Sequence, residues 1–460
     1  TTQFDETANC YDVSAYIKDT SLVFYSPKTI FAPENSSYLF SNTSYTNKLS
    51  NVKTLSLQNF NTSNVTNMRD MFLKCSNLTS LDISSFDTSS ATRMEGMFSG
   101  CKSLTSLDIS NFDTRNVTTM GGDYDRGMFK DCSSLTTLDV SNFDTSNVTD
   151  MTGMFGGCKS LQTINLSNFD TSNVVNMKEM FSNCDGLKSL DLSNFNTSNV
   201  IYMTNMFIGC NKLLNLNLSS FDTSKVTNMN NMFTECSSLT NLDLSNFGIA
   251  NVTSVGFIFA RCSSLKTIKT PTNVKVVIPL PDNNFYNVAD LTTSYSKIPV
   301  GDASMTLKRG YTITANANNG TIAETDGWRG SGDTATKVVL WDNNAVASFP
   351  TVTRDGFTLK GWYTSATGNT QVETTTKITA DTTIYAQWTP GTITLRIEHW
   401  LLNVGGDSSN VSDYTYQEYS FETATVESTV YSSNYALSRT GWVHNSSLDS
   451  SMVLTSSNSN

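Results

Sequence analysis

The chain has 460 residues, a formal net charge of -11 at pH 7 and a pI near 4.7. Its length predicts about three domains. Charged residues make up only 15% of the chain, less than the usual ~25%, and uncharged polar residues, chiefly Ser, Thr and Asn, are correspondingly frequent. The acidic balance excludes a phosphate-backbone binder, which needs clustered Lys and Arg, so we expect no nucleic-acid partner.

Histidine is almost absent, because only His399 and His444 occur. A histidine-rich metal site, or a catalytic triad with a histidine base, therefore has almost nothing to be built from. No run of about 18 apolar residues is present, so we expect no membrane span, and no signal peptide is recognisable. We expect the chain to be a soluble part of a longer protein.

The cysteines reveal internal repeats between residues 49 and 270. Successive cysteines are 26 residues apart, except for one gap of 31. The cysteines of this series are Cys75, Cys101, Cys132, Cys158, Cys184, Cys210, Cys236 and Cys262. A constant period of this size predicts a solenoid, whose units must stack because none can bury its apolar face alone. Residues 1–48 are predicted to be an N-terminal cap, since Tyr38, Leu39 and Phe40 resemble a degraded repeat segment.

Each repeat carries two apolar patterns in succession. The first alternates apolar and polar residues, as in Leu81, Asp82, Ile83 and Ser84, and predicts a short strand. The second spaces apolar residues by three, three, one and three, which is the face of a helix. In the first repeat its members are Val65, Met68, Met71, Phe72 and Cys75. One parallel strand and one short helix are therefore expected in every repeat.

The repeat sequence resembles a known family. The pattern L-x-x-L-x-L followed by N-F-D-T-S-N-V-T-N-M, M-F and Cys resembles the BspA-like leucine-rich-repeat surface proteins of bacteria. The resemblance implies an α/β leucine-rich-repeat solenoid, with parallel strands on the concave face and short helices on the convex face. It also implies an adhesin or host-interaction protein displayed outside the cell.

The sequence beyond residue 270 changes character. Residues 271–309 are predicted to be a C-terminal cap and linker, because Pro271 ends the repeat pattern. Residues 310–390 contain N-N-G-T-I, R-D-G-F-T-L-K-G-W-Y-T and T-A-D-T-T-I-Y-A-Q-W, and resemble the internalin-type B repeat, or Listeria-Bacteroides repeat, a small β-grasp-like module. Residues 391–460 are predicted to be a second β-rich module, truncated, that is similar to mucin-binding-protein-like repeats.

The cysteine series could indicate metal binding, redox work or disulfides, since stacked repeats bring thiols into disulfide range. Each Cys, however, belongs to the apolar face of its repeat, and Leu49 takes its place in the first partial unit. We therefore interpret the cysteines as buried small hydrophobic residues. Free thiols would also mean that folding does not depend on oxidation.

The middle position of each predicted strand forms a polar column that we consider the candidate partner-binding site. Its members are Asp82, Asp108, Asp139, Asn165, Asp191, Asn217 and Asp243. Stacked like charges repel, so a basic protein partner or Ca²⁺ could relieve them, or water and the interleaved Asn could suffice. No metal site or other cofactor is otherwise expected. A second column, with Asp87, Asp113, Asp144, Asp170 and Asp222, is expected to cap turns by accepting backbone N–H bonds.

The 31-residue repeat contains an expansion that could protrude as a contact loop. It carries Asp123, Tyr124, Asp125 and Arg126. Loops also tolerate insertions freely, so a loop without function is the alternative.

These patterns predict a non-enzymatic, monomeric protein on the bacterial cell surface, with signal peptide and anchor outside this sequence. Catalysis needs one unique position, whereas the copies of a repeat are equivalent. The expected partner is a host extracellular-matrix or cell-surface protein, or another bacterial surface, bound by the solenoid with the β modules as a stalk. Two alternatives stay open, a carbohydrate-binding protein that uses the Trp-containing C-terminal modules and a purely structural spacer.

Overall fold

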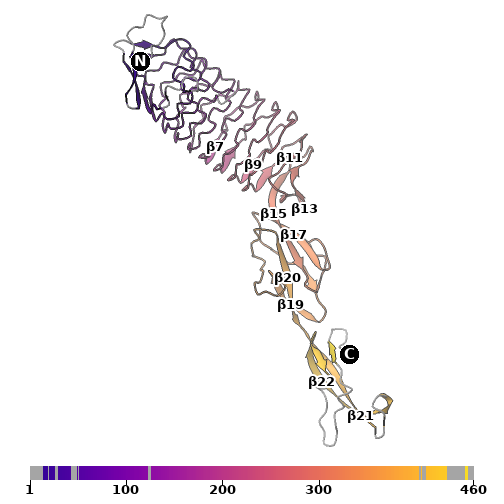
Figure 1. Cartoon of the computed structure of the whole chain (residues 1–460). Coiled ribbons are helices and arrows are strands. Elements are labelled where there is room, and N and C mark those ends of the chain that lie inside the picture. Colours follow the sequence, from indigo (N-terminus) through magenta and orange to yellow (C-terminus); the bar gives the residue numbers. More distant parts are fainter. Residues whose placement is uncertain are drawn as a thin grey trace. The chain divides into compact units, whose positions relative to one another are not determined.

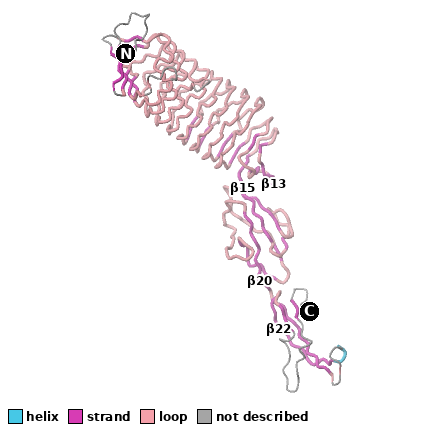
Figure 2. Tube along the Cα trace, in the orientation of Figure 1, coloured by secondary structure: helices cyan, strands magenta, loops and turns pink. Residues whose placement is uncertain are grey.

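The computed structural model describes residues 14–18, 20–25, 29–42, 49, 51–122, 126–403, 406, 411–431 and 451–453. The chain divides into two compact units, Thr1–Arg309 and Gly310–Asn460. Figure 1 shows the first unit as a series of coils, each lying on the next, and Figure 2 shows that most of each coil is loop and turn. We call each coil a rung.

The strands of the first unit are short. They are β1 (Ser14–Lys18), β2 (Ser21–Tyr25), β3 (Ile30–Phe31), β4 (Thr54–Ser56), β5 (Phe60–Asn61), β6 (Ser80–Asp82), β7 (Ser189–Asp191), β8 (Asn215–Asn217), β9 (Asn241–Asp243), β10 (Thr267–Lys269), β11 (Ile278–Pro279), β12 (Phe285–Asn287), β13 (Asp290–Tyr295) and β14 (Lys297–Ile298), followed by the start of β15 (Thr306–Asn316). Strand β4 pairs in parallel with β6, β7 with β8, and β9 with β10. Antiparallel pairing of β15 with β10 and β12 ends the stack.

The expected α/β leucine-rich-repeat solenoid with helices on its convex face is wrong. The only helix among the described residues is the 3₁₀ helix η1 (Val411–Asp413), in the second unit. The segment that we expected to be helical, from Val65 to Cys75, is a run of turns.

Two features of this segment explain why it is not a helix. The N–H groups of Met71 and Cys75 donate to carbonyls three residues back, in tight turns. Other N–H groups donate to the next rung instead, as Phe72 does to Met97 at 2.8 Å, so no helical bond is left for them. Asp70 and Lys74 have φ values of 54° and 60°, and many later copies of these two positions hold Gly or Asn, which favour such backbone. These are Gly96, Gly100, Gly153, Gly157, Asn183, Asn205, Gly209 and Asn231.

The rungs stack in register on this side of the unit, which we call the turn face. A continuous series of parallel bridges joins equivalent residues of successive rungs, in the order Asn35, Asn67, Arg93, Thr119, Asp150, Asn176, Tyr202, Asn228 and Ser254. The register persists across the rung with the five-residue expansion, because Thr119 pairs with Asp150 directly.

The repeated apolar residues form the core, as expected. Val65, Met68, Met71 and Phe72 are fully buried, and their counterparts in later rungs are buried too. Rings of one Phe column stack on each other with centroids 5.5–5.9 Å apart. This column runs through Phe40, Phe72, Phe98, Phe129, Phe155, Phe181, Phe207, Phe233 and Phe259.

Buried polar side chains tie neighbouring rungs together. One column of Thr hydroxyls, each at most 1% exposed, donates to backbone carbonyls of the next rung. Asn side chains bind backward, as Asn142 does to the carbonyls of Ile109 and Phe112. Because a buried backbone group without a partner is costly, these columns hold the rungs at a fixed spacing where no strand ladder does so.

The second unit contains a mixed sheet and a hairpin. Its strands are the end of β15, β16 (Thr321–Ile322), β17 (Thr334–Leu340), β18 (Val352–Thr353), β19 (Phe357–Tyr363), β20 (Thr382–Pro390), β21 (Thr392–Leu402), β22 (Tyr414–Thr425), β23 (Thr429–Tyr431) and β24 (Ser451–Val453). Strand β15 pairs antiparallel with β17 and parallel with β20, which pairs antiparallel with β19. Strands β21 and β22 form a separate antiparallel pair. The core of the sheet contains Ile313, Trp328, Trp362 and Ile384.

Candidate functional site

The predicted polar column lies on the side of the stack that carries β4 and β6–β10, which we call the strand face. Alternate residues of these strands are exposed and buried, as in Ser189–Asp191 and Asn241–Asp243. All seven members of the column are exposed, except Asp82, which is half-buried. The strand face therefore presents carboxylates, amides and hydroxyls to solvent.

Each member of this column also caps its own turn. The Oδ1 atom of every one accepts the backbone N–H of the Ser two residues later, at 2.9–3.1 Å. Hydrogen bonds from Ser84 and Ser110 hold the pKa of Asp82 and Asp108 below the usual value. The carboxylates are thus ionised at neutral pH, and Asp and Asn serve this turn equally because both offer an acceptor.

The ends of the column are partly occupied. Asp82 accepts hydrogen bonds from Gln58 and Ser56 of the preceding rung, and Asp243 forms an ion pair with Lys269 at 2.7 Å. Within the part of the chain that the structure describes, Asp108 and Asp139 form no such pair. The uncompensated negative charge therefore lies in the middle of the strand face.

An open depression of about 520 Å³ lies at the same place. It is lined by Ser106, Leu107, Asp108, Thr137, Leu138, Asp139, Thr163, Ile164 and Asn165. These residues form no strand, in contrast to β6 on one side and β7 on the other. Apolar floor, hydroxyl groups and two carboxylates converge there, so the depression is the best-formed part of the candidate site.

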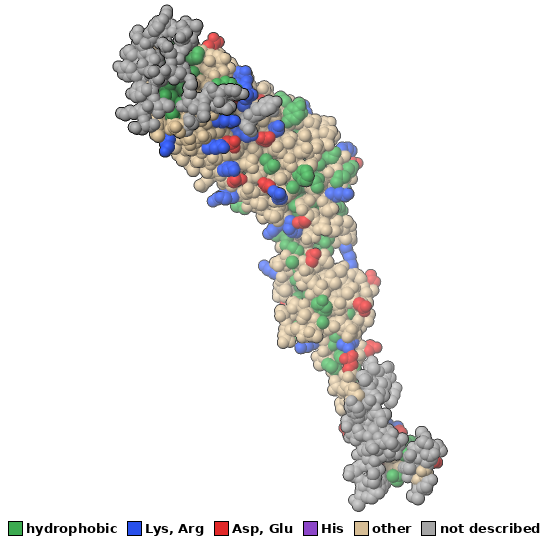
Figure 3. Space-filling model, viewed as in Figure 1, with side chains coloured by type: hydrophobic (Ala, Val, Ile, Leu, Met, Phe, Trp, Pro, Cys, Tyr) green, Lys and Arg blue, Asp and Glu red, His purple; other side chains and the backbone are tan. Residues whose placement is uncertain are grey.

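Much of the remaining surface of the first unit is uncharged. On the side of the molecule visible in Figure 3, uncharged polar side chains and backbone predominate, with Lys or Arg beside Asp or Glu in several places. Among the described residues, no group of three or more His, Cys, Asp or Glu could hold a metal ion. The Ca²⁺ alternative for the strand face stays a prediction. No described helix has the length and hydrophobicity of a membrane span.

The second acidic column caps turns, as expected. Asp87, Asp144 and Asp222 each accept the backbone N–H of the residue two positions later, at 2.9–3.0 Å. Hydrogen bonds from Ser89 and Ser146 lower the pKa of Asp87 and Asp144. This column is a structural feature of the turns.

The eight cysteines of the repeats, from Cys75 to Cys262, are free and buried, as expected for small core residues. Each Sγ donates to a Phe backbone carbonyl of the preceding rung, as Cys158 does to Phe129 at 3.2 Å. Burial raises the pKa of Cys158 to about 12. Such thiols stay protonated and are poor nucleophiles or metal ligands.

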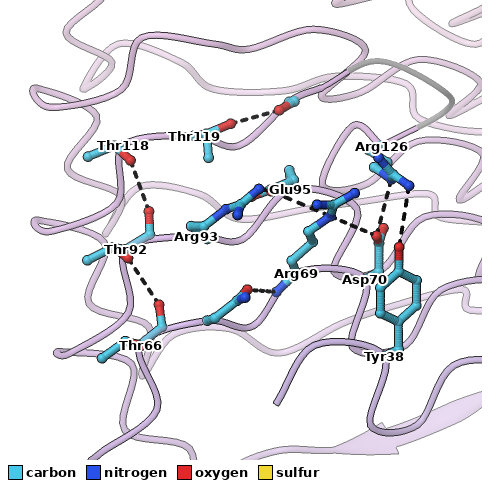
Figure 4. Close-up of polar contacts among 12 residues, drawn as sticks. Tyr38, Thr66, Arg69, Asp70, Thr92, Arg93, Glu95, Thr118, Thr119 and Arg126 are labelled. Atoms are coloured by element: carbon cyan, nitrogen blue, oxygen red, sulfur yellow. Dashed lines mark hydrogen bonds and ion pairs between the residues drawn. The ribbon is translucent and has the colours of Figure 1, made fainter. Parts of the chain in front are cut away.

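Of the four residues predicted to form a contact loop, the structure describes only Arg126, which is half-buried. Asp123, Tyr124 and Asp125 lie outside the described residues, whereas Arg126 forms an ion pair with Asp70 at 3.2 Å. It also donates to the hydroxyl of Tyr38, as Figure 4 shows. Arg126 therefore joins the expanded rung to Asp70 of the first rung and to Tyr38 of the segment that we predicted to be an N-terminal cap.

The carboxylates of Asp70 and Glu95, near Arg126, are buried and form ion pairs with arginines. Asp70 is fully buried and also pairs with Arg69 at 3.1 Å, and Glu95 pairs with Arg93. Each of the two carboxylates keeps one buried oxygen, Oδ1 of Asp70 and Oε2 of Glu95, without a hydrogen-bond partner. A buried carboxylate is costly unless it is paired, so the arginines are needed to hold these rungs together.

The sequence patterns missed one exposed surface, on the β21–β22 hairpin. Trp400, Tyr416, Tyr419 and Phe421 are exposed there, whereas Trp328 and Trp362 are buried. The sequence Y-T-Y-Q-E-Y-S-F, from residue 414 to 421, contains two aromatic pairs, but regular alternation would place these pairs on opposite faces of the strand. The register shift between His399 and Trp400 brings Tyr416, Tyr419 and Phe421 to one face, and no sequence pattern indicated it.

Comparison with known families fits the two-unit organisation. Three overlapping matches to the family described as Mycoplasma protein of unknown function, DUF285, cover residues 34–136, 125–214 and 186–297. The chain belongs to this family. Residues 311–387 match the Listeria-Bacteroides repeat domain. No curated protein matches the chain.

Membership of the DUF285 family and the second match are consistent with the predicted BspA-like surface protein, and confirm the predicted Listeria-Bacteroides repeat. Both families are typical of bacterial surface proteins, and this fits a role at the cell surface. The rungs of the DUF285 region carry the strand face, and the exposed hairpin follows the matched repeat domain.

Proposed function

We propose that this protein is an extracellular adhesin or host-interaction protein of a bacterial surface, without enzymatic activity. Its strand face binds a macromolecular partner, either a host extracellular-matrix or cell-surface protein or another bacterial surface. The β modules of the second unit serve as a stalk, and the chain acts as a monomer.

The observation that carries this proposal is the unpaired charge at the centre of the strand face. Asp108 and Asp139 are exposed, ionised and adjacent to an open depression with an apolar floor. Lys and Arg side chains combine an apolar stem with a cationic head, and they match such a surface. A basic segment of a partner protein is therefore the contact that this surface favours.

The test removes charge without disturbing the turns. In the full chain, Asp108, Asp139 and Asp191 are changed to Asn, which stands at this position in Asn165 and Asn217 and keeps the Oδ1 acceptor. Binding to immobilised matrix proteins, host cells and bacterial cells should fall at least tenfold. A protein that binds equally well after the change would contradict the assignment to the strand face.

A matched control removes three charges elsewhere. Glu324, Asp326 and Asp333 are exposed in the second unit, and their change to Gln or Asn should leave binding intact. Equal losses for both triple variants would indicate a general effect of net charge. No binding by the unaltered chain to any of these surfaces would instead favour a structural spacer.

Carbohydrate binding by the C-terminal modules is the second candidate function. It is favoured by one observation, the exposed side chain of Trp400 beside three other exposed rings. The buried Trp328 and Trp362 cannot meet a ligand from solvent. Retention of the full chain by an immobilised polysaccharide would support this candidate.

A further inference from the structure

The β21–β22 hairpin has two faces of different chemistry. On one face of β21, Ile393, Leu395 and Ile397 are buried or half-buried. On the other face, Trp400 lies opposite Tyr416 of β22. We call this second face the aromatic face, and its members are Arg396, Glu398, Trp400, Tyr416, Tyr419 and Phe421.

The four rings of the aromatic face are open to solvent. Trp400 is 50% exposed, Tyr416 38%, Tyr419 51% and Phe421 61%. In the second unit the exposed aromatic side chains of the described residues lie on this face, whereas Phe31, Tyr38, Tyr202 and Phe257 are exposed at separate places in the first unit. The aliphatic side chains of β21 lie mainly on the opposite face. Exposed rings on one face of a hairpin can stack on a flat ligand.

Contacts within the aromatic face hold its side chains in place. The rings of Trp400 and Tyr416 meet edge to face at 5.4 Å, and those of Tyr419 and Phe421 at 5.3 Å. Trp400 donates from Nε1 to Glu398 at 3.2 Å. Because the rings are already fixed by their neighbours, a ligand would lose little affinity to ordering them.

The two charges of the aromatic face neutralise each other. Arg396 forms an ion pair with Glu398, and its guanidinium lies over the ring of Tyr419 at 4.7 Å. This face has no net charge to offer a polyanion, a polycation or a charged membrane surface. Its electrostatic complement is an uncharged ligand that can still hydrogen-bond to a carboxylate and a guanidinium.

The size of the aromatic face argues against a second copy of the chain as its occupant. The exposed fractions of the four rings amount to about two whole aromatic side chains, or about 400 Å². A stable protein interface buries about 800 Å² on each partner. An extended, narrow ligand is therefore a better fit than a folded surface.

We propose that the aromatic face binds an uncharged polysaccharide. Pyranose rings present apolar C–H faces that stack on Trp400, Tyr419 and Phe421, while their hydroxyl groups bond to Glu398 and Arg396 at the ring edges. This assignment rests on the second candidate function above, and it specifies both the site and the ligand class.

The experiment uses the full chain in native gels that contain soluble starch, laminarin or galactomannan. At least one of these neutral polymers should retard the protein, and Trp400→Ala should weaken that retardation at least tenfold. Thr394→Ala changes an exposed residue of β21 without a ring and should have no effect. Tyr416→Phe keeps the ring and should retain most of the binding.

The outcomes separate the site from the function. Retardation that Trp400→Ala and Phe421→Ala leave unchanged would overturn this site but not carbohydrate binding by the second unit. The absence of retardation in every neutral polymer would overturn both. Retardation by heparin alone, or self-association that Trp400→Ala abolishes, would also overturn the proposal. The strand-face triple Asn variant should bind polysaccharide normally, which distinguishes this site from the proposed protein-binding surface.

Discussion

The buried thiols of the stack predict an alkaline limit to its stability. Eight cysteines are buried and free. Burial raises the pKa of Cys158 and of Cys210 to about 12 and that of Cys184 well above its usual value, whereas an unfolded chain releases these protons near pH 9. A group with a higher pKa in the native state stabilises it fully below the unfolded pKa, and the contribution is lost as the pH rises toward the folded pKa.

The size of this loss follows from the number of thiols. One pH unit above the unfolded pKa, each buried thiol lowers the free energy of unfolding by about 1.4 kcal/mol. Eight thiols in the core together give about 11 kcal/mol at pH 10. A domain is typically stable by about 5–15 kcal/mol, so the first unit should unfold near pH 10.

Urea unfolding followed by circular dichroism at pH 7, 8, 9 and 10 measures this dependence. Cys158→Ala should reduce the loss between pH 8 and pH 10 by about 1.4 kcal/mol, because one proton fewer is released. Val174→Ala is a matched control, since it shortens an equally buried side chain that has no ionisable group. An unfolding free energy that is constant from pH 8 to pH 10, or rapid labelling of the thiols by iodoacetamide in the native protein, would refute the reasoning.

Three further predictions concern the polar contacts of the stack. The buried Thr145 hydroxyl donates to the carbonyl of Asp170 and accepts its N–H, so Thr145→Val should lower the free energy of unfolding in urea titrations by about 1–3 kcal/mol for each of these two backbone groups left without a partner. In the control Thr163→Val, at an exposed position, the free energy of unfolding should change by no more than about 0.5 kcal/mol. Arg126→Ala should speed amide hydrogen exchange in residues 66–75, because it removes one of the ion-pair partners of the buried Asp70; unchanged exchange would contradict this role. The free energy of unfolding should fall as the pH drops below about 4, because the turn-capping carboxylates have lowered pKa values in the fold and their contribution is lost when they are protonated. A free energy of unfolding that is constant from pH 5 to pH 2 would contradict this prediction.

The sequence was sufficient to predict which residues are buried but not the backbone that buries them. Spacings of three and four place side chains on one side of a helix, and they do the same in a run of tight turns. The pattern from Val65 to Cys75 is therefore compatible with both. The deciding signal was Gly or Asn at the positions of Asp70 and Lys74 in most later repeats, because helix interiors disfavour Gly and left-handed backbone favours both.

Long-range contacts set the other limits of prediction. The capping role of Asp87 was readable because its acceptor and donor are two residues apart. The ion pair between Arg126 and Asp70 joins residues of different rungs, and no local sequence pattern predicts it. The aromatic face likewise depends on which residue of β22 lies opposite Trp400, a register that a single strand does not specify.

The strand face separates the structural requirement of its column from the charge that a partner would meet. The turn needs only an Oδ1 acceptor, which Asp108 and Asn165 both supply to the N–H two residues later. The choice between Asp and Asn therefore leaves the rung unchanged while it sets the local charge. Recognition by charge would therefore depend on which positions of the column hold Asp. Asp108, Asp139 and Asn165 all line the depression, so two of its three column positions are charged. Asp108→Asn should thus weaken partner binding strongly while the midpoint of urea unfolding at neutral pH falls only slightly, because Asn keeps the acceptor for Ser110 but not its charge. A large fall in the midpoint would show that the fold needs the charge itself.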